Sequence, residues 1–90
     1  MITIMPTLLI DVRTKGEFEE RHAEGAVNIP VEEICDRKLG VLENIGKNTP
    51  LYLYCRSGTR SEKAKEILRS FGYTDVVNLG GLDDVMGEGM

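Results

Sequence analysis

Short apolar runs alternate with helix-forming segments along this chain, and that alternation limits the fold more than any other feature of the sequence. The apolar runs 8–12, 26–29, 51–54 and 74–79 are predicted strands, and Pro30 ends the second because proline cannot donate to a strand ladder. Strands that alternate with helices pair in parallel through right-handed crossovers. We therefore expect an α/β domain of three layers, in which helices flank a mostly parallel sheet of four to five short strands.

The first helical segments are marked by a capping motif and by the spacing of apolar side chains. Thr14 and Glu17 form a capping box, which predicts a helix that begins there and carries Phe18 inward. In the segment 31–45 the helical spacing is interrupted at Gly40, so one broken helix or two short helices are expected.

Glycines mark the turns around the later elements. Gly25 is expected to permit a tight turn before the second strand. The segment 61–71 has apolar residues along one helical face, and Gly72 should cap its C-terminus. After the last strand, Gly80 and Gly81 should turn the chain into a short tail.

The length and charge of the chain argue against several classes of protein. Ninety residues have room for one domain, placed at 1–90, with residues 1–6 as either a leader or a short edge strand. No apolar run approaches the roughly 18 residues that span a bilayer. Fifteen acidic and eleven basic side chains give a net charge of -4, which argues against a nucleic-acid partner. One histidine and two cysteines are too few for a protein-only zinc site, so neither a metal nor a cofactor is expected.

The candidate site is the loop between the strand 51–54 and the following helix. Cys55 ends this strand, and Gly58 lies in the loop. Thr59 and Glu62 form a second capping box, which predicts a helix that begins at about position 60. In parallel α/β sheets the reactive site lies at the carboxyl ends of the strands, next to helix N-termini. We expect the amides of the loop and of the first helical turn to point at the cysteine sulfur.

Such a cradle of amides favours an anion at Cys55. A helix N-terminus carries about half a positive charge, so the pKa of this thiol is expected to lie below its ordinary value. Arg56 and Arg60 add fixed positive charge, which suits an anionic substrate or leaving group. A cysteine at a strand end is otherwise a small apolar core residue. The glycine, the two arginines and the capped helix favour a reactive nucleophile.

The other cysteine has a different setting. Cys35 shares an apolar stripe with Ile34 and Leu39, so we interpret it as a core residue. The alternative is a resolving thiol for Cys55. Two reduced thiols are favoured over one disulfide, because a chain with this apolar content does not need a covalent crosslink.

Charged residues near the first strand are candidates for supporting roles. Asp11 and Arg13 flank the end of that strand, on the side of the sheet where the site is expected. Structural ion pairs, Asp11 with Arg60 and Arg13 with Glu17, are favoured over direct contact with substrate. His22 stands next to a turn and is interpreted as a scaffold residue rather than a proton donor.

Five motifs in this order and spacing resemble a single-domain rhodanese. They are Asp11-Val12-Arg13, Glu17-Phe18, His22 to Pro30, Tyr54 to Ser61, and Gly80-Gly81-Leu82. The resemblance spans about residues 8–84, and the shortness of the chain is similar to the phage-shock-protein-E type. A tryptophan often found after the paired glycines is absent, so Leu82 and Val85 are expected to cover that flank of the site.

The resemblance implies a thiosulfate sulfurtransferase in which Cys55 alternates between thiolate and persulfide. The thiolate attacks the sulfane sulfur of thiosulfate, sulfite leaves, and the persulfide passes its sulfur to cyanide or to a thiol. This ping-pong reaction needs no general base, because the cradle already holds the thiolate. A thioredoxin-like protein is one acceptor to consider, and the protein is expected to be a monomer.

Each loop residue then has an expected role. Arg56 should attract the anionic donor. Ser57, Gly58 and Thr59 should supply backbone amides. Arg60 should brace the loop and add positive potential.

Two alternatives are weighed against this function. A persulfide carrier or regulatory relay would use the same cysteine without turnover. A cysteine phosphatase or an arsenate reductase is less favoured, because those loops place five residues between cysteine and arginine, whereas four separate Cys55 from Arg60 here. The smaller ring suits a single sulfur atom better than a tetrahedral phosphate.

The N-terminus gives limited information on compartment. It lacks the charged region and the cleavage site of a secretory signal, which favours the cytoplasm. A periplasmic protein whose signal peptide was removed is the alternative.

Overall fold

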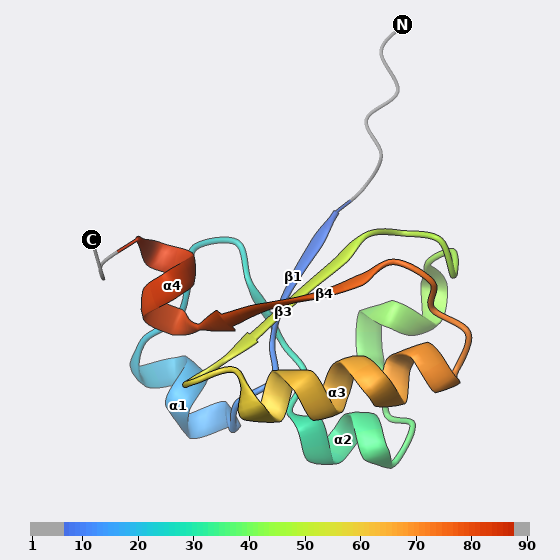
Figure 1. The fold of residues 1–90 in the computed structure, drawn as a ribbon. Helices are drawn as coiled ribbons and strands as arrows, with labels where there is room; N and C mark the ends of the chain where they lie inside the picture. Colours follow the sequence, from blue (N-terminus) through green and yellow to red (C-terminus); the bar gives the residue numbers. More distant parts are fainter. Residues whose placement is uncertain (1–6, 88–90) are drawn as a thin grey trace, which may run out of the picture.

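The computed structural model describes residues 7–87. Residues 1–6, for which a leader or an edge strand is expected, lie outside the described residues, as do residues 88–90. The elements follow one another as β1 (Leu8–Asp11), α1 (Lys15–Glu20), β2 (Val27–Asn28), α2 (Val31–Cys35), the 3-10 helix η1 (Gly40–Asn44), β3 (Leu51–Cys55), α3 (Thr59–Ser70), β4 (Val76–Gly81) and α4 (Leu82–Met86) (Figure 1). None of the helices in 7–87 combines the length and the apolar character needed to cross a membrane.

The four strands form one sheet in the order β2-β1-β3-β4, and each neighbouring pair is parallel. The carboxyl ends of β1 and β3 therefore lie at the same edge, with Asp11 beside Tyr54 in the register. The predicted α/β class and the predicted parallel sheet are confirmed. The short strands follow from the short apolar runs of the sequence.

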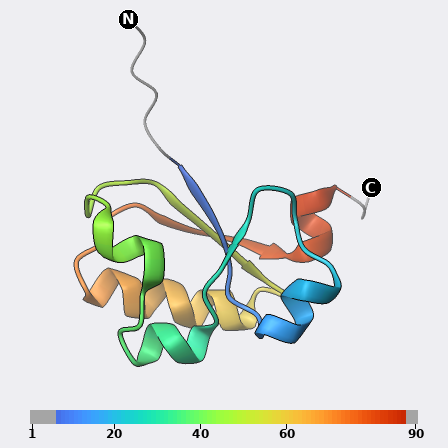
Figure 2. The ribbon, with the colours of Figure 1, turned by 180° about the vertical axis from the view of Figure 1, so that it is seen from behind.

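Side chains alternate between two faces of the sheet along β3. Leu51, Leu53 and Cys55 belong to the main core, which α2, η1 and α3 cover. Tyr54 points to the opposite face, where it packs with Ala23 and with the first residue of α4. Helices α2 and α3 lie together on one side of the sheet in both views, whereas α4 packs against the end of β4 (Figures 1 and 2). Three layers result, as predicted.

The predicted capping box at the start of α1 is present. The Glu17 amide donates to Thr14 Oγ1 at 3.2 Å, and the Thr14 amide donates to Glu17 Oε1 at 3.0 Å. The expectation that this helix carries Phe18 into the core is wrong. Helix α1 has no buried residue, and the half-buried Phe18 ring stacks on His22 with 3.8 Å between the ring centroids. A helix of six residues is too short to cover the core, so its ring stays at the edge.

The interrupted segment 31–45 forms two short helices, α2 and η1, and Gly40 at the break has a φ of +58°. Gly25 and Gly72 also have positive φ, which confirms the predicted turn and the predicted helix end. Cys35 is exposed, so its interpretation as a core residue is wrong. Helix α2 ends at this residue, and the apolar stripe therefore does not continue over it.

The predicted tail after Gly80 and Gly81 is also wrong. Strand β4 continues to Gly81, which pairs with Cys55 of β3, and helix α4 begins at the next residue. The Gly81 amide donates to Asp84 Oδ2 at 2.8 Å, so an acidic side chain in the first turn holds the start of α4. The ladder shifts its register between Leu53 and Cys55, and Gly80 takes a φ of +97° at this irregularity, which a glycine adopts without strain.

A buried ion pair lies at the end of β1. Asp11 is fully buried and Arg13 is 6% exposed. Asp11 Oδ2 lies 2.6 Å from Arg13 Nη2, and Asp11 Oδ1 accepts from the Arg13 amide at 2.9 Å. The predicted partners were therefore wrong: Asp11 pairs with Arg13, and Glu17 pairs with Arg60. Asp11 and Arg13 pair because they are only two residues apart at the end of the strand. The Arg13 guanidinium also donates to the Arg21 carbonyl at 2.5 Å.

Removal of one member of this buried pair should cost far more than removal of an exposed carboxylate. We expect Asp11→Ala to lower the free energy of unfolding by about 3 to 5 kcal/mol, because it leaves the buried arginine without its counter-charge. The matched control is Asp83→Ala, whose carboxylate is 68% exposed and should cost at most about 1 kcal/mol. Urea denaturation measures both. Equal losses in the two variants would contradict the structural role of the pair.

Candidate active site

Cys55 ends β3 at the carboxyl edge of the sheet, and the residues predicted for the site follow it directly. This residue is 1% exposed. Gly58 has a φ of +99° and is the N-cap of α3, so the helix begins at Thr59. A left-handed residue at this point reverses the chain, which turns the loop back over the sulfur. The predicted position of the loop between strand and helix is confirmed.

The predicted capping box of Thr59 and Glu62 is wrong. Thr59 is already helical, and no side chain caps α3. Glu62 Oε1 instead accepts a hydrogen bond from Asn78 Nδ2 of β4 at 3.0 Å. The carboxylate is engaged by the neighbouring strand, and the Gly58 carbonyl accepts the first helical hydrogen bond, from the Glu62 amide at 3.0 Å.

Hydrogen-bond donors of the loop and of the first turn of α3 reach the cysteine sulfur. The Gly58 amide donates to Cys55 Sγ at 2.9 Å, and the hydroxyl of the buried Ser61 lies 3.5 Å from it. Burial raises the pKa of the Cys55 thiol, but hydrogen bonds from Ser61, Ser57 and Gly58 outweigh burial, so this pKa lies below its ordinary value. The loop thus favours an anion at a position that is nearly closed to water.

The two loop arginines differ in their partners. Arg60 Nη1 and Nη2 lie 2.8 Å and 3.1 Å from the two carboxylate oxygens of Glu17. This two-pronged contact fixes α1 against the start of α3 and holds the pKa of Glu17 at about 2. Arg56 is exposed, and within residues 7–87 no hydrogen bond or ion pair engages its guanidinium. Its positive charge is therefore available to an incoming anion.

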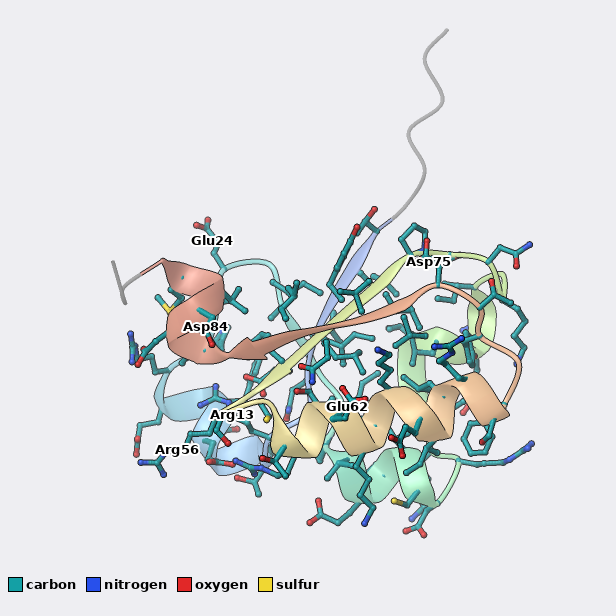
Figure 3. All side chains as sticks on the ribbon, viewed as in Figure 1. Arg13, Glu24, Arg56, Glu62, Asp75 and Asp84 are labelled. Carbon is teal, nitrogen blue, oxygen red and sulfur yellow. The ribbon has the colours of Figure 1, made fainter. Side chains whose placement is uncertain are left out.

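A polar pocket of about 290 Å³ borders the loop. Arg13 and Arg56, which both belong to it, lie at the same end of the molecule, next to α1 and the start of α3 (Figure 3). Leu82 closes part of its wall, as expected for the flank that lacks a tryptophan, and Val85 packs behind Leu82. The pocket is lined by Arg13, Glu17, Glu20, Arg21, Arg56, Leu82 and Asp83.

The paired glycines of β4 allow the strand to approach the loop closely. A Cβ atom on Gly81 would overlap the Arg56 carbonyl oxygen. A Cβ atom on Gly58 would lie 3.3 Å from the Gly80 Cα. The strand end therefore supports the loop from the side, backbone against backbone.

Sequence reasoning gave no role to two polar residues behind the sulfur. Ser61 is fully buried on the apolar face of α3, and Asn78 interrupts the apolar run of β4. Ser61 Oγ lies 2.6 Å from Asn78 Oδ1. The signal in the sequence was that each of these polar residues occupies a position where its neighbours on the same face are apolar. For the Thr59 amide, which was expected to point at the sulfur, the expectation stays a prediction.

The close approach at Gly81 can be tested by adding one methyl group. Gly81→Ala should lower the free energy of unfolding by about 1 to 3 kcal/mol and slow alkylation of Cys55, because the loop must move away from the strand. In the matched control, Gly16→Ala, the methyl group meets nothing within 4 Å. That helical position should be neutral or gain up to about 1 kcal/mol. A Gly81→Ala protein as stable and as reactive as the parent would refute the contact.

Known proteins resemble this chain over most of its length. It is 42% identical over 76 residues to "Thiosulfate sulfurtransferase PspE" of Escherichia coli (strain K12), a match that covers 84% of this chain and 71% of that protein. It is 44% identical over 73 residues to the uncharacterized protein YqhL of Bacillus subtilis (strain 168), covering 81% of this chain but 55% of that protein.

Solved structures agree with these relatives. A structure described as "rhodanese with anions from E. coli" superposes with a TM-score of 0.77 at 40% identity, over 88% of this chain and 91% of that one. The human single-domain sulfurtransferase TSTD1 gives a TM-score of 0.76 at 27% identity, over 91% of this chain and 82% of that one. The family description "Rhodanese-like domain" matches residues 2–88. With its cysteine cradle, its fold and these relatives in agreement, the chain belongs to the rhodanese family.

Proposed function

We propose that this protein is a thiosulfate sulfurtransferase that carries one sulfur atom on Cys55 between two half-reactions. The observation that supports this function best is the pair of donors on Cys55 Sγ, the Gly58 amide at 2.9 Å and the Ser61 hydroxyl at 3.5 Å. They favour a thiolate in a buried position, where a cysteine would otherwise be neutral. Membership in the rhodanese family and the similarity to PspE support the same class of reaction.

The first half-reaction loads the cysteine. The Cys55 thiolate attacks the outer sulfur of thiosulfate, the sulfur–sulfur bond of thiosulfate breaks, and sulfite leaves with the electron pair. The product is a persulfide whose terminal sulfur is anionic. The amides that hold the thiolate are suited to this second anion, because backbone donors around a loop bind negative charge at either sulfur position.

The second half-reaction transfers the sulfur from the Cys55 persulfide to an acceptor. Cyanide or an acceptor thiolate attacks the terminal sulfur, the persulfide bond breaks, and the Cys55 thiolate is regenerated. The products are thiocyanate or a new persulfide, and neither step requires an added oxidant or reductant. Since the nucleophile is already deprotonated, no general base has to stand beside it, which agrees with a loop that contains no histidine.

Positive charge near the loop serves the anionic donor in two ways. Arg56, exposed at the rim of the pocket, attracts thiosulfate and stabilises departing sulfite. Arg60 is neutralised in part by Glu17, so its main part is to brace the loop. Asp11 and Arg13 have a structural role, because their charges form an ion pair with each other.

The central prediction concerns a covalent adduct. Thiosulfate is expected to add about 32 Da, the mass of one sulfur atom, to the reduced protein, and peptide mapping should place it on Cys55. Cys55→Ser should lose both the adduct and the formation of thiocyanate from thiosulfate and cyanide. The matched control is Cys35→Ser, which should keep both, because this exposed thiol at the end of α2 is outside the loop.

Mass spectrometry and steady-state kinetics on these proteins also separate the alternatives. An adduct on Cys35 would refute the assignment of the nucleophile. Repeated turnover is the expected result for an enzyme. A single burst of thiocyanate followed by arrest would instead identify a persulfide carrier, which delivers its sulfur to a bound partner.

A further prediction concerns the exposed arginine at the rim. Arg56→Ala should raise the KM for thiosulfate roughly two- to fivefold, the effect of one exposed charge pair, with less change for a neutral polysulfide donor. Arg56→Lys should retain most of the effect of the charge. Arg69→Ala, a matched loss of one arginine from the far end of α3, should leave both donors unaffected. Equal effects of Arg56→Ala on the charged and the neutral donor would contradict its electrostatic role.

A further inference from the structure

The side-chain amide of Asn78 uses all of its hydrogen-bonding positions. Asn78 is half-buried on β4. Its Nδ2 donates to the Gly58 carbonyl and to Glu62 Oε1, each at 3.0 Å. Its Oδ1 accepts from the Gly80 amide at 2.9 Å and from Ser61 Oγ at 2.6 Å. These partners fix the orientation of the amide, because an N–H group can donate only to the oxygen and a carbonyl can accept only from the nitrogen.

Two of these partners are the residues that contact the nucleophile. Gly58 is held by Asn78 at its carbonyl and donates its amide to Cys55 Sγ at 2.9 Å. Ser61 is held by Asn78 at its hydroxyl, which also lies 3.5 Å from the sulfur. The Asn78 amide on the neighbouring strand therefore contacts both residues that contact the sulfur, Gly58 and Ser61.

The Ser61 hydroxyl has one hydrogen and several acceptors within reach. Asn78 Oδ1 lies at 2.6 Å, the Gly58 carbonyl at 3.1 Å and Cys55 Sγ at 3.5 Å. Its short contact with Asn78 keeps the oxygen in place beside the sulfur. These acceptors compete for the single hydrogen. When it points at the sulfur, the 2.6 Å contact with Asn78 Oδ1 becomes a contact between two acceptors, so the hold of Asn78 on the cradle rests on the Gly58 carbonyl.

We propose that Asn78 is a positioning residue for Cys55, and that its Nδ2, through the Gly58 carbonyl, holds the Gly58 amide as a donor to the sulfur. The inference rests on the proposed function only for the identity of the reacting residue. Asn78 does not touch the sulfur, so it acts through Gly58. A merely structural link between β4 and α3 would affect the stability of the fold but would not alter the titration of the thiol.

The test measures that titration directly. In a Cys35→Ser background Cys55 is the one remaining thiol of the chain, and the pH dependence of its alkylation by iodoacetamide gives the thiolate pKa. Asn78→Ala should raise this pKa by about one unit, which corresponds to about tenfold slower alkylation at a pH below both values. Asn78→Asp should raise it further, because a carboxylate beside the Gly58 carbonyl repels the loop and adds negative charge near the sulfur.

Two further variants make the assignment specific. Ser61→Ala tests the other route: the shift caused by Asn78→Ala should persist when Ser61 is also replaced by alanine, because that shift passes through Gly58 and not through the Ser61 hydroxyl. The matched control is Asn48→Ala, an asparagine that accepts from Thr74 Oγ1 at 2.8 Å on another part of the surface. Its alkylation profile should equal that of the parent.

Each other outcome overturns the proposal. An unchanged pKa in a folded Asn78→Ala protein would leave Asn78 with a structural role alone. A lowered pKa would show that Asn78 withholds the Ser61 hydroxyl from the sulfur. If circular dichroism shows that Asn78→Ala does not fold, Asn78→Ser carries the test, because it removes the Nδ2 donor to Gly58 without adding a charge near the sulfur. Alkylation requires no sulfur transfer, so a protein inactive toward thiosulfate would refute the proposed function and leave this inference standing.

Discussion

The hydrogen bond from the Gly58 amide to Cys55 Sγ connects the chemistry of this protein to its fold. Gly58 can adopt its positive φ because it has no side chain, and the resulting turn points its amide at the sulfur while its carbonyl accepts from Glu62 to begin α3. One residue thus closes the cradle and starts the longest helix. The arrangement depends on the close approach of β4, which Gly81 permits because a Cβ atom there would overlap the loop backbone.

Much of this architecture was predictable from local patterns. Apolar runs that alternate with helical segments define a parallel sheet, and the register of such a sheet places the ends of β1 and β3 together. A cysteine that ends a strand and is followed by a glycine and a helix is placed where the amides of the loop can reach its sulfur. For this reason the loop around Cys55 and its position were predicted well, although the helix begins at Thr59 without the capping box expected for it.

The ion pairs, the exposure of Cys35 and the contacts of Asn78 could not be predicted from the sequence. Two acidic and two basic side chains near one strand end allow more than one set of pairs, and the sequence does not rank Arg13 against Arg60 as the partner of Asp11. An apolar stripe does not show where a helix stops, so the exposure of Cys35 was missed. Asn78 contacts the loop from the neighbouring strand, and although a polar residue interrupts the apolar run there, the sequence does not show which distant segment it contacts.

Helix α1 has no buried residue. Beyond its own capping box, the contacts described between it and the rest of the chain are largely electrostatic, and the main one is the bidentate ion pair between Glu17 and Arg60. The same helix provides part of the wall of the pocket that borders the Cys55 loop, through Glu17 and Glu20. Attraction between partly exposed charges weakens as dissolved ions screen it, whereas apolar packing does not weaken in that way. Higher ionic strength therefore weakens the contact of α1 with the start of α3, whereas the packing of the core under the sheet is unaffected.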